Sequence, residues 1–254
     1  KETGAKNQTW GLASSPLIVG DRVYVQSDVG GPAAVAVDKN TGKVVWKSAA
    51  RSGSYAPIVQ VDVDGTKQLI VFGHKHIYGI KPEDGATIWE HPWETKYDVN
   101  ATTPIYRDGH LFMTSNYGKG CIMLKLSPTG AQKLWENDTV TARFQPPILD
   151  GDHMYVNSEG TLMCLSWPDG KVAWQVREGG LLGMGGSLVR TGDQLLLLSE
   201  RGKLTLVTAT PAGMEKIASV PLIDGREVWA TPTLYNGRLY AKGPQSLVCV
   251  DIKP

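Results

Sequence analysis

The sequence predicts an all-β fold, a β-propeller built from four-stranded antiparallel blades. A repeat of about 43 residues runs along the chain, as propeller blades require. Gly-Asp, Asp-Gly and Asn-Gly pairs separate short apolar segments, which is typical of tight β-hairpins. No segment of helical length shows a period of 3.6 residues. The 254 residues suit a single propeller domain over 1–254, with five complete blades and a partial sixth.

The clearest repeat unit is the segment 36–47, AVDKNTGKVVWK. Related segments lie at 79–90, 124–136, 164–175 and 207–219. The first four units carry a tryptophan near their end, namely Trp46, Trp89, Trp135 and Trp174. In the fifth unit we assign Ile217 to the tryptophan position.

A second marker precedes each unit: a small or polar pair, then usually a proline, an apolar pair, a turn and a strand. It occurs six times, anchored at Pro16, Pro57, Pro104, Pro147, Ser187 and Pro232. The two markers divide each unit into four short strands. In the third unit we expect them near 103–106, 110–115, 121–126 and 132–136.

Four residues of the first unit have a physical role in this pattern. Gly42 permits a turn with positive φ, and Asp38 can accept hydrogen bonds from backbone donors in that turn. Trp46 offers a large flat face to a neighbouring blade. Ala36 must stay small to receive such a ring. Other units carry Gly79, Cys164 and Cys249 there, so we expect these two cysteines to be small core residues.

The pattern Ala36-x-Asp38-x-x-Thr41-Gly42-x-x-x-Trp46 resembles the tryptophan-docking motif of the pyrroloquinoline-quinone-repeat, or quinoprotein-like, propellers. The resemblance covers essentially the whole chain. This family includes quinone-dependent dehydrogenases and a non-catalytic lipoprotein of outer-membrane assembly. The resemblance implies a periplasmic or otherwise extracytoplasmic protein, anchored to the membrane as a lipoprotein in full length.

Members of this family usually have seven or eight blades and begin with a signal peptide. The resemblance therefore implies that the chain is a fragment lacking N-terminal blades and a signal peptide. The alternative is a six-bladed ring closed by the first residues.

The charge balance argues against some partners. With 26 Lys and Arg against 25 Asp and Glu, the net charge is +1, which gives no reason to expect nucleic acid. No stretch approaches the roughly 20 apolar residues that a transmembrane helix needs. Three scattered cysteines form neither a disulfide framework nor a zinc site.

The loops between blades, together with those joining second to third strands, should gather on one face of a propeller. We expect a binding site for a protein partner or a small ligand there, at the channel mouth. The alternative is that these residues only pack the corners between blades. The candidate residues are Trp10, Tyr55, Tyr97, Asp98, Asn100, Arg143, Phe144 and Trp229.

For the quinone-dependent dehydrogenases, the resemblance implies a pair of adjacent cysteines, a calcium ion and an aspartate base. The sequence has no adjacent cysteines, and only Asp98 and Asn100 stand out as oxygen ligands. We interpret His74 and His76 as histidines in a turn that are exposed to solvent. We therefore expect a non-catalytic binding or scaffolding module that needs no cofactor. The alternative is an alcohol or sugar dehydrogenase that uses pyrroloquinoline quinone and calcium.

Overall fold

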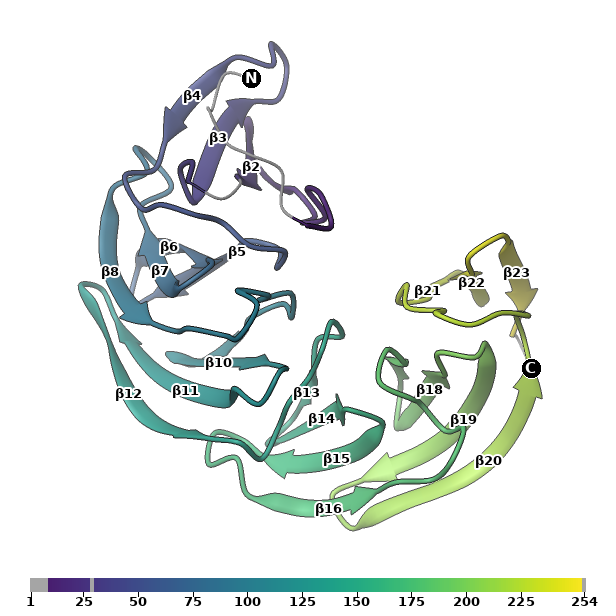
Figure 1. Cartoon of the computed structure of the whole chain (residues 1–254). Coiled ribbons are helices and arrows are strands. Elements are labelled where there is room, and N and C mark those ends of the chain that lie inside the picture. The colour runs from purple at the N-terminus through teal and green to yellow at the C-terminus, as the bar shows by residue number, and fades with distance from the viewer. Residues whose placement is uncertain (1–8, 28–29, 253–254) are drawn as a thin grey trace. The chain divides into compact units, whose positions relative to one another are not determined.

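The computed structural model describes residues 9–27 and 30–252, and over these residues the secondary structure consists of β-strands (Figure 1). They form six antiparallel sheets, five of four strands and one of three, in each of which neighbouring strands follow one another along the chain. This confirms the predicted all-β propeller class, with five complete blades and a partial sixth. The chain divides into two compact units, Lys1–Thr141 and Ala142–Pro254.

The first unit contains three blades of four strands each. Blade 1 consists of β1 (Leu17–Val19), β2 (Arg22–Gln26), β3 (Ala34–Asp38) and β4 (Val44–Lys47). Blade 2 consists of β5 (Val59–Val63), β6 (Thr66–Phe72), β7 (His76–Ile80) and β8 (Thr87–Pro92). Blade 3 consists of β9 (Ile105–Arg107), β10 (His110–Ser115), β11 (Gly120–Ser127) and β12 (Gly130–Asn137), close to the predicted strands.

The second unit contains the remaining three blades. Blade 4 consists of β13 (Ile148–Asp150), β14 (His153–Ser158), β15 (Thr161–Ser166) and β16 (Val172–Val176). Blade 5 consists of β17 (Ser187–Thr191), β18 (Gln194–Leu198), β19 (Lys203–Thr210) and β20 (Gly213–Pro221). Blade 6 consists of β21 (Thr233–Tyr235), β22 (Arg238–Lys242) and β23 (Leu247–Asp251).

The register between the third and fourth strands explains the repeat of tryptophans. In four blades a tryptophan lies directly opposite a residue of the third strand; the pairs are Ala36–Trp46, Gly79–Trp89, Met123–Trp135 and Cys164–Trp174. A β-bulge follows each pair, so the residue before each tryptophan has no partner. In blade 5 the same bulge places Ala218 opposite Leu206. The assignment of Ile217 to the tryptophan position is therefore wrong, because Ile217 is the unpaired residue of the bulge and Ala218 holds that position.

The tryptophans join successive blades within each unit. Trp46 Nε1 donates a hydrogen bond of 2.9 Å to the carbonyl of Pro82 in blade 2, and its ring lies against Gly85, where a Cβ would come within 2.6 Å. Trp174 Nε1 of blade 4 donates in the same way to the carbonyl of Thr210 in blade 5, at 2.7 Å. Trp89 instead donates to Gln68 of its own blade, and Gln68 donates onward to Ser127 of blade 3.

The positions opposite the tryptophans differ from the expectation in one blade. Gly79 and Cys164 are buried, and a Cβ on Gly79 would overlap the Trp89 ring. Cys249 is exposed, so the prediction that it is a core residue is wrong. The physical reason is that blade 6 has three strands in the described part of the chain, so no tryptophan covers this cysteine.

The turn of the first repeat unit behaves as the sequence predicts. The Asp38 carboxylate accepts hydrogen bonds from the backbone N–H groups of Asn40 (3.1 Å) and Thr41 (2.8 Å) and from the Thr41 hydroxyl (2.9 Å). These bonds, that from the Thr41 backbone first, lower the pKa of Asp38 below its ordinary value. Gly42 closes the turn with a φ of 71°.

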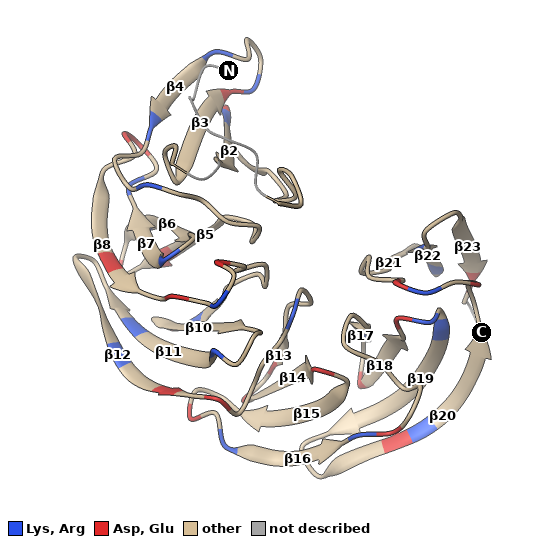
Figure 2. Ribbon diagram, in the orientation of Figure 1, with Lys and Arg blue, Asp and Glu red and all other residues tan. Residues whose placement is uncertain are grey.

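Positive and negative side chains are interspersed along both units (Figure 2). Lys and Arg, like Asp and Glu, occur on both strands and turns, in keeping with the net charge of +1. Over the residues described, no helix is long and apolar enough to span a membrane.

Candidate functional site

In the first unit, loops carry two pairs of aromatic side chains that contact each other within each pair. Trp10 is 61% exposed and packs edge-on against Tyr55, with ring centroids 5.7 Å apart. Tyr97 is 55% exposed and meets Tyr117 in a T-shaped contact, with centroids at 5.0 Å. We call Trp10, Tyr55, Tyr97 and Tyr117 the aromatic surface.

Backbone hydrogen bonds hold the loops of the aromatic surface together. The N–H groups of Tyr55 and Ala56 both donate to the carbonyl of Asn100, at 3.0 and 2.9 Å. The Ser54 hydroxyl donates to the carbonyl of Asp98 at 3.2 Å and accepts from the Asn100 N–H at 3.0 Å. The loop after blade 1 and the loop after blade 2 are therefore fixed to each other, as a preformed surface requires.

Asn100 supports this surface from below. Its side chain is fully buried, and its Nδ2 donates to the carbonyls of Gly73 (2.7 Å) and His74 (3.2 Å). Its Oδ1 accepts a hydrogen bond of 2.7 Å from the Ser115 hydroxyl. Because its polar atoms are already used inside the protein, Asn100 positions the loop and offers nothing to an external ligand.

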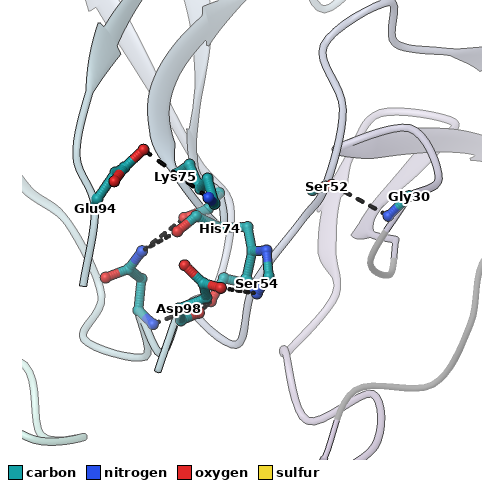
Figure 3. Close-up of polar contacts among 9 residues, drawn as sticks. Gly30, Ser52, Ser54, His74, Lys75, Glu94 and Asp98 are labelled. Atoms are coloured by element: carbon teal, nitrogen blue, oxygen red, sulfur yellow. Dashed lines mark hydrogen bonds and ion pairs between the residues drawn. The ribbon is translucent and has the colours of Figure 1, made fainter. Parts of the chain in front are cut away.

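Asp98 lies beside His74, with Oδ2 and Nε2 separated by 3.3 Å (Figure 3). The two side chains come from the loop after β8 and the turn before β7, and they are 31% and 18% exposed. The interpretation of His74 as a solvated turn histidine is therefore wrong, because most of its side chain is covered and it has a carboxylate partner. Asp98 adopts a left-handed φ of 55°, a conformation that costs a non-glycine residue about 1 kcal/mol or more.

In the second unit, Arg143, Phe144 and Trp229 also meet. The rings of Phe144 and Trp229 lie with their centroids 5.2 Å apart, and the Arg143 guanidinium lies 5.9 Å from the centre of the Phe144 ring. Arg143 also contacts the Met184 sulfur at 3.4 Å and the Glu159 carboxylate at 3.8 Å. The side chains of this cluster therefore already contact one another or neighbouring side chains of the second unit.

Trp229 is 39% exposed but firmly held. Its carbonyl accepts a hydrogen bond of 2.5 Å from Gln145 Nε2, and Gln145 Oε1 accepts one of 2.5 Å from the Thr231 hydroxyl. The indole lies so close to Gly185 that a side chain there would overlap it. The alternative interpretation, that the candidate residues only pack the corners between blades, therefore suits Trp229 better than Tyr97.

Sequence reasoning missed two residues of these clusters. Tyr117 lies in the loop between β10 and β11, and only its place in a loop of the same predicted face could have indicated it. Gln145 is the first residue of the proline marker of blade 4, where the pattern gives no functional signal. Its role depends on contacts with Trp229 and Thr231, more than 80 positions away.

The residues present do not fit a calcium ion with a quinone. Over the residues described, no group of three or more His, Cys, Asp and Glu side chains lies close enough to hold a metal. Asn100 Oδ1, one of the two expected oxygen ligands, is bonded to Ser115, and Asp98 faces His74. The 254-residue sequence contains no adjacent cysteines.

Comparisons with known proteins give a family and several structural neighbours. A family model described as "Outer membrane protein assembly factor BamB" matches residues 5–176. The solved structure of BamB from Moraxella catarrhalis has a TM-score of 0.68 and 20% identity, covering 92% of this chain and 67% of that one. No curated protein sequence matches.

Two further solved structures resemble the chain equally well. The quinohemoprotein alcohol dehydrogenase from Comamonas testosteroni has a TM-score of 0.67 and 10% identity, with 91% of this chain and 51% of that one covered. The computationally designed Ika8 protein has a TM-score of 0.67 and 8% identity, with 91% and 67% covered. Since an enzyme and a designed protein score alike, these likenesses show the fold alone. The family model covers more than half of the sequence, and the chain therefore belongs to the outer membrane protein assembly factor BamB family of pyrroloquinoline-quinone-repeat propellers.

Proposed function

We propose that this chain is a non-catalytic binding module that holds a protein partner against the aromatic surface of its first unit. The single observation that carries this proposal is the exposure of Tyr97 on a loop that backbone hydrogen bonds join to the loop of Tyr55. Exposed tyrosine and tryptophan side chains supply much of the energy of protein interfaces. Rigid loops lose little conformational entropy when a partner binds.

The chemistry of the surface favours a polypeptide over a small charged molecule. Tyr97 and Tyr117 present rings and hydroxyl groups, and Lys96 adds a cation 5.4 Å from the Tyr97 ring. Membership of the BamB family supports a partner from the assembly of outer-membrane proteins and a periplasmic location.

Site-specific photo-crosslinking in the cells that make this protein tests the proposal. A benzophenone amino acid replaces Tyr97 in one variant, Tyr117 in a second and Leu134 in a third. Leu134 is a matched control, because it is 45% exposed on the outer strand of blade 3. We expect the same protein adduct from positions 97 and 117 and none from position 134. Equal yields at all three positions, or no adduct, would contradict the proposal.

The second candidate function is a quinone-dependent alcohol or sugar dehydrogenase, because the motif from Ala36 to Trp46 also resembles the repeats of those enzymes. Titration of the purified protein with pyrroloquinoline quinone and calcium, followed by absorbance, separates the two. A binding module gives no saturation and no reduction of an electron-accepting dye when alcohols are added. Saturable binding at micromolar quinone with alcohol-dependent dye reduction would establish the enzyme instead.

A further inference from the structure

The turn between β10 and β11 carries a tyrosine where the backbone does not favour one. The Lys119 N–H donates to the carbonyl of Asn116 at 3.4 Å, which closes a turn around Tyr117 and Gly118. These two central residues have φ angles of 61° and 75°. Asparagine, aspartate and glycine usually occupy such a turn, because a bulky side chain is strained at positive φ. A strained residue of this kind indicates that its side chain has a role beyond folding.

Contacts on this turn and the strand before it tie them to the loop after β8. Trp93 Nε1 donates a hydrogen bond of 3.1 Å to the Ser115 hydroxyl. The Lys119 ammonium lies 4.2 Å from the centre of the Trp93 ring. Tyr97 and Tyr117 add the T-shaped contact described above. The turn and the loop are therefore held together at more than one point.

Two buried side chains between these contacts each have a polar atom without a partner. Thr95 and Asn116 are 8% and 4% exposed, and among the residues described neither Thr95 Oγ1 nor Asn116 Nδ2 has a hydrogen-bond partner. Asn116 Oδ1 accepts a hydrogen bond of 2.5 Å from the Tyr117 N–H, so only its nitrogen is left over. Buried donors without an acceptor are rare and costly. An amide donor of this kind suits a carbonyl oxygen that a binding partner supplies.

The conformation of the partner follows from its need for free carbonyl groups. In an α-helix the carbonyls are bonded within the helix, and an added β-strand needs a free sheet edge. β10 and β11 offer no such edge, because each is paired on both sides in the strand order β9-β10-β11-β12. A polyproline II segment has no internal hydrogen bonds, so its carbonyls stay available, and its proline rings pack on aromatic side chains. This conformation suits both the tyrosine rings and the amide donor.

We propose that the partner places a proline-rich segment in the polyproline II conformation on Tyr97 and Tyr117. This partner class rests on the proposed function, since it names what the aromatic surface binds. The proline rings pack on the two tyrosines, and main-chain carbonyls accept hydrogen bonds from the Tyr97 hydroxyl and from Asn116 Nδ2. The Asn116 nitrogen is covered in the structure, so binding includes a side-chain shift at this turn, as is common at interfaces.

Titration of the isotope-labelled protein with decaproline, followed by nuclear magnetic resonance, tests the partner class. We expect saturable shifts of the Asn116 side-chain amide and of the Tyr97 and Tyr117 rings, and none with a Gly-Ser peptide of equal length. Tyr97→Phe and Asn116→Asp each remove one donor and should weaken binding about tenfold, as measured from the remaining ring signals.

Two further variants separate loss of the site from loss of the fold. Asn137→Asp is the matched control for Asn116→Asp, because it adds the same charge and its Oδ1 likewise accepts from a backbone N–H, that of Thr139, at 3.0 Å. It should leave the affinity unchanged. Tyr117→Asn should abolish binding without lowering the thermal midpoint, because asparagine fits this turn with less strain.

The outcomes also separate the partner class from the proposed function. If positions 97 and 117 crosslink a protein in cells but decaproline gives no saturable shift, the partner class is overturned and the proposed function stands. Binding of the Gly-Ser peptide as tightly as decaproline, or unchanged affinity of Asn116→Asp, would also overturn it. Decaproline binding at these residues without any crosslinked protein would support the peptide site and contradict the proposed function.

Discussion

Buried amide side chains fix the loops of this protein at the residue scale. Asn100 binds the carbonyls of Gly73 and His74, and in the second unit Asn157 binds those of Gly183 and Gly186, at 2.9 and 2.7 Å. An amide group can donate twice and accept as well, so one side chain satisfies several backbone groups that strands do not pair. The candidate binding loops are therefore held by single residues beneath them.

Replacement of Asn100 by alanine should lower the free energy of unfolding by about 3 kcal/mol. The substitution leaves the carbonyls of Gly73 and His74 and the Ser115 hydroxyl without this partner in a buried site. Urea denaturation measures the change. Asn40→Ala, in an exposed turn, is the control and should change stability by less than about 0.5 kcal/mol. If Asn100→Ala lowered the free energy of unfolding by less than about 1 kcal/mol, this would contradict the role of Asn100 in holding the loops.

The contribution of Asp38 to stability should depend on pH in the acid range. Hydrogen bonds from Thr41 and Asn40 lower the pKa of Asp38 in the folded protein below that of the unfolded chain. Its stabilising effect is therefore fully present above the unfolded pKa of about 4 and is lost as the pH falls through the folded pKa. Denaturation of the unmodified protein and of Asp38→Ala at a series of pH values should give a difference that shrinks below about pH 4. A difference independent of pH would exclude this account.

At the scale of the element, the fourth strand of each blade decides how blades join. The side chains of Trp46 and Trp174 lie on the inner face and bond to the turn of the following blade. The residue before each, such as Val45, points outward because of the bulge. This bulge also explains why the sequence misplaced the tryptophan position of blade 5, since one unpaired residue shifts the alternation between the two faces.

Trp46→Ala should reduce the free energy of unfolding by about 3–5 kcal/mol, the range for emptying a buried tryptophan site. The ring is 8% exposed and contacts Gly85 and Tyr24, so its loss leaves a cavity between blades 1 and 2. Val45→Ala on the outward face is the control, with an expected change below about 0.5 kcal/mol. Chemical denaturation of both variants gives the comparison, and equal effects would show that the tryptophan does not join the blades.

At the scale of the whole molecule, the sequence predicted the architecture better than the site. The repeat, with its prolines and tryptophans, predicted the six sheets because each blade is a local unit whose strands pair in chain order. The pairing of His74 with Asp98 and the burial of Asn100 could not be predicted, since they depend on loops that meet only after folding. The exposed Cys249 likewise depends on which strands cover blade 6.

The affinity for the protein crosslinked through position 97 tests the central claim most directly. It is measured by isothermal titration with the purified partner for the unmodified protein, for Tyr97→Ala with Tyr117→Ala, and for Leu134→Ala. We predict that the double substitution weakens binding about 30-fold, as expected for aromatic residues at the centre of an interface, with unchanged circular dichroism and with Leu134→Ala at the unmodified affinity. Unchanged affinity of a folded double variant would contradict the claim that the aromatic surface binds the partner.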